Sequence, residues 1–213
     1  MTKEVTAMQY DGIIFDLDGT LWDSTKEVMV AWNHVLALQD DISRMPTMED
    51  LAGVMGLGAD DLTKKLFPHL PFERRMEIFD TCAAYENDYL AKHGAVLYPH
   101  LIETLEQLAK DHPLFIVSNC GKGYIETFML AHDTEKFITD FECIGRTGKP
   151  KSENIKLIVE RNSLKNPVYV GDTQWDCDAA TAAGVPFIFA AYGFGKVEGK
   201  PTIHDFAELP NLV

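Results

Sequence analysis

The chain has 213 residues, 46% of them hydrophobic and 24% charged, so a folded domain with a real core is expected and a disordered or collagen-like chain is excluded. Its 19 Lys and Arg stand against 33 Asp and Glu, and the resulting net charge of −14 disfavours nucleic acid and anionic membrane surfaces as partners. The first residues do not resemble a secretion signal, and no apolar stretch is long enough to span a bilayer. The four cysteines form no CxxC pair, which favours reduced thiols and a cytoplasmic protein.

Short apolar segments bounded by Gly, Pro or Asp predict buried strands, weakest in the last of the following ranges: 12–16, 113–118, 167–171, 186–190 and 141–144. From residue 97 onward, segments with helical spacing of apolar residues alternate with these strands. Continuous apolar strands separated by helices are typical of a parallel sheet with helices on both faces. The sequence therefore predicts an α/β fold with a doubly wound, Rossmann-like parallel sheet.

The segment from Ser24 to Ala95 interrupts this alternation. It contains no convincing strand, and its apolar residues, such as Val28, Trp32 and Val35, follow helical spacing. We therefore expect a helical cap subdomain at residues 24–95, inserted after the first strand of a core formed by residues 1–23 and 96–213.

Carboxylates follow two of the predicted strands. Asp16 and Asp18 come at the end of the first strand and, being two residues apart in an extended chain, start on the same face. Asp172 follows the strand at 167–171, and Asp176 comes one helical turn later. Ligands of open α/β sheets bind at the carboxyl ends of the strands, so these carboxylates are expected to converge. They would repel one another unless a cation lies among them, and an all-oxygen site beside a phosphate favours Mg2+.

Groups suited to a phosphate follow the other strands. Ser118 and Asn119 end the strand at 113–118, where a hydroxyl, an amide and the free N–H groups of a helix start suit an oxyanion. Lys149 lies in a later loop. Mg2+ and Lys149 together would neutralise the repulsion between an anionic nucleophile and an anionic phosphate, which predicts phosphoryl-transfer chemistry.

These residues carry a family resemblance through four motifs in chain order: Asp16-Leu17-Asp18-Gly19-Thr20, Ser118-Asn119, Lys149-Pro150 and Gly171-Asp172-Thr173-Gln174-Trp175-Asp176. Together they resemble the motifs of the haloacid dehalogenase superfamily, in particular its phosphoglycolate phosphatase and β-phosphoglucomutase branch. The predicted helical insert is similar to the cap that many members carry between the first and second motifs.

The resemblance implies roles for the acidic residues. Asp16 would be the nucleophile that forms an aspartyl-phosphate, and Asp18 would protonate the leaving group and then activate water. Asp16, the backbone carbonyl of Asp18, and Asp172 would bind Mg2+. Asp176 would hold the water shell of the metal or orient Lys149.

The resemblance also implies a phosphate-binding set. Ser118 and Asn119 would bind the transferring phosphoryl group, with Gly19 and Thr20 contributing from the first motif. Lys149 would bridge the phosphoryl group and the nucleophile and so act as a further catalytic residue.

The predicted activity is a Mg2+-dependent phosphatase for a small phosphorylated metabolite, with phosphoglycolate as the best single guess. Sugar phosphates, nucleoside monophosphates and pyrophosphate stay open as substrates, and a β-phosphoglucomutase-like mutase would share every core residue named. A phosphorylated signalling switch also combines Asp, Mg2+ and Lys, but such receiver domains are shorter and lack the paired aspartates and the cap. In the cap, Lys64 and Lys65 are candidates for recognising an anionic substrate, with solvated lysines as the alternative. The sequence predicts no oligomeric state.

Overall fold

The computed structural model describes residues 10–54 and 56–213, so the segment used to exclude a secretion signal lies outside the described residues. The strands are β1 (Gly12–Phe15), β2 (Trp22–Asp23), β3 (Val96–Leu97), β4 (Leu114–Ser118), β5 (Ile138–Cys143), β6 (Pro167–Gly171), β7 (Phe187–Ala190) and β8 (Thr202–Ile203). The α-helices are α1 (Thr25–Leu36), α2 (Met48–Ala52), α3 (Ala59–Leu66), α4 (Phe72–His93), α5 (Leu101–Leu108), α6 (Tyr124–His132), α7 (Ile144–Thr147), α8 (Lys151–Arg161) and α9 (Gln174–Ala183). Two short 3-10 helices are η1 (Glu135–Phe137) and η2 (Phe206–Asn211).

The main sheet has six strands in the order β5-β4-β1-β6-β7-β8, and all neighbouring strands are parallel. Each strand expected from the apolar pattern is present, and the doubly wound α/β prediction is confirmed. The weakest prediction, 141–144, was too short, because β5 begins at Ile138 in a half-exposed stretch without a continuous apolar run. The two-residue strand β8 adds an edge that the sequence pattern did not predict.

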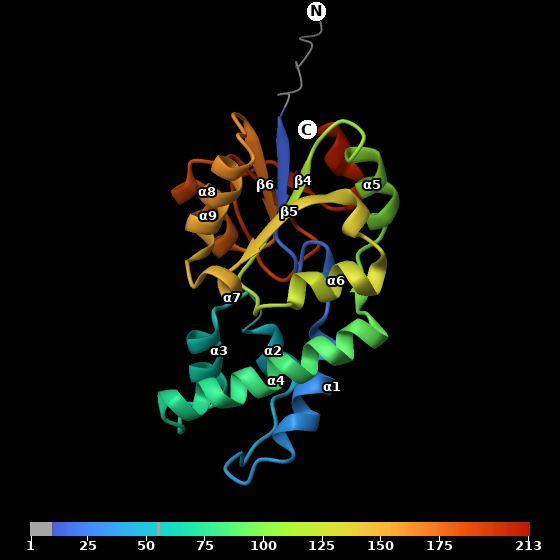
Figure 1. The fold of residues 1–213 in the computed structure, drawn as a ribbon. Helices are drawn as coiled ribbons and strands as arrows, with labels where there is room; N and C mark the ends of the chain where they lie inside the picture. The colour runs from blue at the N-terminus through green and yellow to red at the C-terminus, as the bar shows by residue number, and fades with distance from the viewer. Residues whose placement is uncertain (1–9, 55) are drawn as a thin grey trace, which may run out of the picture.

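Alternating side chains of the central strands pack into two hydrophobic layers. Ile13 and Phe15 of β1 face the layer covered by α5 and η2, and Ile14 faces the layer covered by α8 and α9. Successive side chains of a strand point to opposite faces of the sheet. Because helices cover both faces here, the central strands need apolar residues at every position. The arrangement places helices on both sides of the sheet, as Figure 1 shows for α5 on one side and α8 and α9 on the other.

Helices α1 to α4 lie between β2 and β3, which pair antiparallel as a separate two-stranded ribbon. Helix α1 packs along α4, and α4 in turn contacts α6 of the core. Figure 1 shows these helices as a layer beyond one end of the main sheet. The boundary of the insert at residues 24–95 stays a prediction. The pairing of β2 with β3 brings together the two chain segments that lead into and out of helices α1 to α4.

Within the described residues, no helix combines the length and the apolar character that crossing a membrane requires.

Candidate functional site

Three buried carboxylates meet at the carboxyl end of the sheet. Asp16 follows β1, Asp172 follows β6, and Asp176 lies in the first turn of α9. One oxygen of each lies within 4.8 Å of the others. Burial and the neighbouring Asp176 raise the pKa of Asp16 well above its usual value, and the same two causes raise the pKa of Asp172 to about 7. Mutual repulsion in a nearly dry site makes this cluster a place where a cation would be strongly favoured.

Lys151 is the cation that the structure places in this cluster. Its Nζ lies 2.7 Å from Asp16 Oδ1 and 2.6 Å from Asp176 Oδ1, and its side chain is 5% exposed. Burial lowers the Lys151 pKa, but the attraction of Asp16 and Asp176 outweighs burial and holds the pKa well above its usual value. The Lys151 ammonium therefore stays charged beside Asp16.

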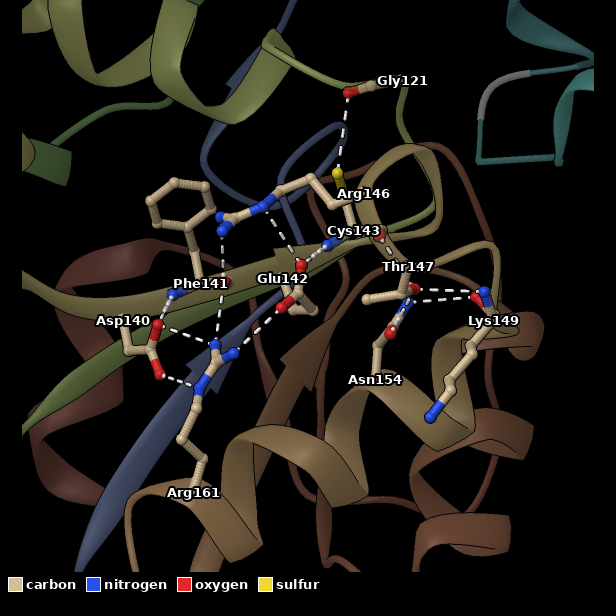
Figure 2. Close-up of polar contacts among 10 residues, drawn as sticks. All are labelled: Gly121, Asp140, Phe141, Glu142, Cys143, Arg146, Thr147, Lys149, Asn154 and Arg161. Carbon is tan, nitrogen blue, oxygen red and sulfur yellow. Dashed lines mark hydrogen bonds and ion pairs between the residues drawn. The ribbon is translucent and has the colours of Figure 1, made fainter.

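Lys149, the residue expected in this role, lies outside the cluster. Its backbone N–H donates to Thr147 Oγ1 and its carbonyl accepts from Asn154 Nδ2, at 3.1 Å in both cases, while its side chain is exposed (Figure 2). Asn154 is fully buried, so the loop is held by its backbone against α8 and the Lys149 side chain is left in solvent. The structure thus replaces Lys149 by Lys151 as the lysine in contact with Asp16.

The ion pairs in Figure 2 hold α8 against β5 and so help to place Lys151. Arg161, the last residue of α8, pairs with Asp140 at 2.7 Å and with Glu142 at 3.1 Å. Arg146 of α7 approaches Glu142 from the other side at 3.4 Å. Glu142 is nearly fully buried, so these two guanidinium groups satisfy a charge that would otherwise be costly.

Gly19 and Thr20 contact Asp172. A Cβ at residue 19 would lie 2.2 Å from Asp172 Oδ2, and the positive φ of 86° also favours glycine there. Thr20 Oγ1 donates to Asp172 Oδ1 at 3.4 Å, and the backbone N–H of Phe194 donates to Oδ2 at 2.7 Å. The first motif and the Tyr192–Phe194 loop therefore fix the orientation of the Asp172 carboxylate.

Asp18 is held by three donors that sequence patterns did not single out for this role. Its Oδ1 accepts from Ser24 Oγ at 2.7 Å, from Tyr124 OH at 2.8 Å and from Trp22 Nε1 at 2.9 Å. Burial raises the pKa of Asp18, although these hydrogen bonds act in the opposite direction. Trp22 begins β2, Ser24 is the N-cap residue of α1 and Tyr124 begins α6, so contacts from three different elements orient this carboxylate.

A pocket between the inserted helices and the sheet brings together Asp16, Asp18, Ser118 and Asn119. Ser118 is buried at the end of β4, and Asn119 Nδ2 donates to the carbonyl of Gly56 at 2.9 Å, which links the core to the loop before α3. The four predicted residues thus share one cavity. Lys149 does not line it, and neither do Lys64 and Lys65, which are exposed.

Lys151, which the motif analysis did not identify, could have been recognised as a buried residue from its position in the sequence. Lys151 stands four residues before Ile155 and seven before Ile158, so helical spacing places it on the buried face of α8. Ser24, Trp22 and Tyr124 had no comparable signal, because their convergence on Asp18 depends on how α1 and α6 sit against the first motif.

Comparison with known proteins identifies the chain's relatives. The haloacid dehalogenase-like hydrolase family matches residues 13–190. A phosphoglycolate phosphatase of Rhodobacter capsulatus is 31% identical over 219 residues, covering 94% of this chain and 95% of the relative. The phosphoglycolate phosphatase of Escherichia coli K12 is 28% identical, covering 88% of this chain and 83% of that protein.

Solved structures show the same fold. A haloacid dehalogenase-like family hydrolase of Streptococcus pneumoniae superposes with a TM-score of 0.81 at 21% identity, covering 95% of this chain and 97% of that one. CbbY of Rhodobacter sphaeroides, solved in complex with phosphate, gives 0.80 at 17% identity, covering 94% and 96%. Together with the match over residues 13–190, these findings confirm the resemblance and the expectation of a hydrolase with phosphatase relatives: the chain belongs to the haloacid dehalogenase-like hydrolase family.

Proposed function

We propose that this hydrolase is a Mg2+-dependent phosphatase that cleaves a small phosphorylated metabolite through an aspartyl-phosphate on Asp16. One observation supports this above all: Asp16 is 3% exposed, bonded to Lys151, and lies in the same pocket as Asp18 and Ser118. Lys151 would offset the repulsion between the Asp16 carboxylate and the phosphate, and Asp18 offers a second carboxyl for proton transfer. Both are needed for attack on a phosphate ester.

The acidic cluster fits a Mg2+ ion. Asp16 and Asp172 offer hard carboxylate oxygens, and burial together with the charge of Asp176 raises the pKa of each. Asp16, the backbone carbonyl of Asp18, and Asp172 would hold the ion. Bound Mg2+ would supply positive charge that offsets the repulsion between the carboxylates and the phosphate.

Asp176 is engaged by groups other than a metal. Its Oδ1 accepts from Lys151 and its Oδ2 accepts from the Thr173 backbone N–H at 3.0 Å, while Thr173 Oγ1 caps the same helix in return. We therefore propose that Asp176 orients Lys151; orienting the lysine, there Lys149, was one of the two functions that the sequence suggested for it, the other being to hold the water shell of the metal.

The proposed reaction begins with attack of an Asp16 carboxylate oxygen on the phosphorus atom. The new Asp16 O–P bond forms as the ester P–O bond breaks, and protonated Asp18 gives its proton to the leaving alkoxide. Asp18 then accepts a proton from water, which attacks the phosphorus and releases inorganic phosphate and free Asp16. The raised pKa of Asp18 supports its first role, because a protonated acid is required at that step.

The remaining groups would hold the phosphate. Ser118 and Asn119 line the same pocket as Asp16, and their hydroxyl and amide groups can donate to phosphate oxygens. Asn119 would have to exchange its hydrogen bond to Gly56 for one to the phosphate, or bind it through the backbone. Lys151, in contact with Asp16, would neutralise the transferring group in the role first assigned to Lys149.

The relatives' names support phosphoglycolate as a reference substrate, and a cytoplasmic location is part of the proposal. A mutase of the β-phosphoglucomutase kind would use the same core residues and differ in passing the phosphoryl group to a sugar hydroxyl. Incubation with β-glucose 1-phosphate separates the two, since a phosphatase releases inorganic phosphate and a mutase yields glucose 6-phosphate.

The central experiment compares the wild-type chain and Asp16→Asn on para-nitrophenyl phosphate, with Mg2+ and with EDTA. We expect Mg2+-dependent release of nitrophenol, and loss of more than about a thousandfold in kcat for the variant, because an amide cannot act as the nucleophile. Asp178→Asn, on the exposed side of α9, is the matched control and should keep its activity. Undiminished turnover by Asp16→Asn would overturn the proposed mechanism.

A further inference from the structure

The pocket above Asp16 has walls that are mostly apolar. Its lining is contributed largely by α1, the α2–α3 segment and α4, with the apolar side chains Val28, Trp32, Leu51, Val54, Leu57, Leu62, Phe79 and Ala83. Among the described residues that line it, none is Lys or Arg. The part of a substrate that extends away from the phosphate therefore meets hydrocarbon and aromatic rings with no cation beside it.

Glu86 of α4 is the acidic exception in this wall. It is 8% exposed, and its Oε2 accepts a hydrogen bond from Trp32 Nε1. The hydrogen bond that Glu86 makes among the described residues uses Oε2, so Oε1 stays available to a ligand in the pocket that Glu86 lines. A carboxyl oxygen that lacks a donor in a pocket is a group that a bound ligand can satisfy.

Asn87, the next residue of α4, presents a second acceptor. Its Nδ2 donates to the Lys122 carbonyl at 3.1 Å, which fixes the orientation of the amide. Its Oδ1 is buried and has no hydrogen-bond partner among the described residues, although Asn87 also lines the pocket. The two polar groups that α4 contributes to the pocket thus offer acceptor oxygens and call for a donor.

We infer, given the phosphatase activity proposed above, that this pocket selects phosphate monoesters whose leaving group is a carbon chain ending in an amine or a hydroxyl, and that it discriminates against leaving groups ending in a carboxylate. An N–H or O–H donor at that end would reach the acceptors of Glu86 and Asn87, while the carbon chain lies against Trp32 and Phe79. A carboxylate there would be buried without a counter-charge, which is costly.

The protonation of Glu86 is compatible with both donors. Burial raises its pKa to about 8, so this carboxyl is mostly uncharged at neutral pH. A substrate ammonium would favour the ionised form and pair with it, and the neighbouring Trp32 ring suits a cation as well. A hydroxyl can donate to either form.

The test is a matched series of phosphate monoesters assayed with Mg2+, in which only the end of a three-carbon chain changes. The alcohols are 1-propanol, 1,3-propanediol, 3-amino-1-propanol and 3-hydroxypropanoate, with phosphoglycolate as a further carboxylate. We expect kcat/KM for the amine or the diol ester to exceed that of both carboxylates by about tenfold or more, because the difference reports transition-state binding in the pocket. A preference for either carboxylate would overturn the inference.

Two variants examine the cause of the preference. Glu86→Gln should reduce the advantage of the amine ester over the propyl ester, whereas Glu73→Gln, an exposed glutamate in the first turn of α4, should leave it unchanged. Leu57→Lys, which places a cation in the wall, should raise kcat/KM for phosphoglycolate relative to the diol ester. If Glu86→Gln does not fold, Leu57→Lys still tests the inference. The inference would be contradicted if the ratio of kcat/KM for phosphoglycolate to kcat/KM for the diol ester were the same in Leu57→Lys as in the wild type.

Para-nitrophenyl phosphate separates this inference from the proposed activity. Hydrolysis of this ester together with a carboxylate preference would refute the inference alone. Failure to hydrolyse para-nitrophenyl phosphate and every ester of the series would refute the proposed phosphatase activity, and the inference with it.

Discussion

Lys151 Nζ lies 2.7 Å from Asp16 Oδ1, from a position two residues after the lysine that the sequence motif indicated. The same ammonium contacts Asp176 at 2.6 Å. Lys151 therefore links Asp16, which follows β1, to the residue whose side chain caps the first turn of α9. All three groups are 5% exposed or less, and their charges are therefore weakly screened by water. This ion-pair cluster holds Asp16 in place on the floor of the pocket.

The first prediction separates the two lysines. Lys151→Met should lower kcat by about 100-fold or more, because the variant removes the charge that stabilises the transferring phosphoryl group and orients Asp16. Lys149→Met should keep kcat within about threefold, since its side chain is exposed and only its backbone is bonded. Steady-state kinetics on para-nitrophenyl phosphate measures both.

Circular dichroism at the assay temperature serves as the control for Lys151→Met, because the variant leaves Asp16 and Asp176 without their shared cation. The opposite order of effects, with Lys149→Met inactive and Lys151→Met active, would contradict the placement of the two side chains.

The position of Lys151 also shows where prediction from the sequence stops. Strands were predictable because both faces of the sheet are covered, so that residues such as Ile13 and Ile14 are both apolar. Asp16 and Asp172 were predictable because parallel strands end at one edge of the sheet. The motif pattern indicated Lys149, whereas Lys151 is the lysine that contacts Asp16, and this outcome depends on the loop whose backbone Asn154 holds.

The contacts that form the pocket wall could not be predicted from the sequence. Trp32 and Glu86 are 54 residues apart, and nothing in their local pattern reveals the hydrogen bond between them. Their contact results from the packing of α1 along α4. Helical spacing predicted that the insert is helical, but it does not specify which faces of the helices meet or what cavity they leave.

The second prediction concerns the donors around Asp18. Tyr124→Phe removes the 2.8 Å hydrogen bond to Oδ1, one of the contacts that lower the pKa of Asp18 against the effect of burial. The pKa should rise further, so the acid limb of the kcat profile, where Asp18 must lose its proton to act as a base, should move to higher pH. We expect kcat near pH 6 to fall by about three- to tenfold.

Tyr89→Phe is the matched control for this prediction, because Tyr89 lies on α4 outside the pocket lining. A fall in kcat that is uniform across pH would indicate a packing defect in Tyr124→Phe, and would count against a role for this hydroxyl in setting the Asp18 pKa.

The third prediction addresses the acidic cluster. Mg2+ should raise the melting temperature of the wild-type chain, because an ion bound only by the folded state adds RT ln(1 + [Mg2+]/Kd) to stability. Asp172→Asn should lose most of this rise, and without Mg2+ it should melt no lower than wild type, since it removes a charge from the repulsive cluster. Calorimetry at constant ionic strength measures both effects, and an undiminished Mg2+ response in the variant would exclude Asp172 as a ligand.

The fourth prediction uses the buried Glu86 carboxyl to relate pH to stability. Its pKa in the folded chain is raised to about 8, against an ordinary value of 4.5, with burial as the largest cause. Between these values the folded chain holds a proton that the unfolded chain has lost, so this group makes stability fall as pH rises. Below about pH 4.5 both states are protonated, and above about pH 8 the loss is complete.

Glu86→Gln removes this dependence while keeping an oxygen that can accept from Trp32 Nε1. Its free energy of unfolding should therefore be close to that of the wild type near pH 5 and higher by several kcal/mol, on the order of 4, at pH 9. Urea unfolding of both chains across this range measures the difference, in which the titration of the Asp16 cluster cancels. Glu73→Gln should show no such divergence, because its side chain is exposed. A constant difference between Glu86→Gln and wild type from pH 5 to pH 9 would mean that Glu86 is already ionised in the folded chain, and an ionised Glu86 would make the pocket still less favourable for a carboxylate.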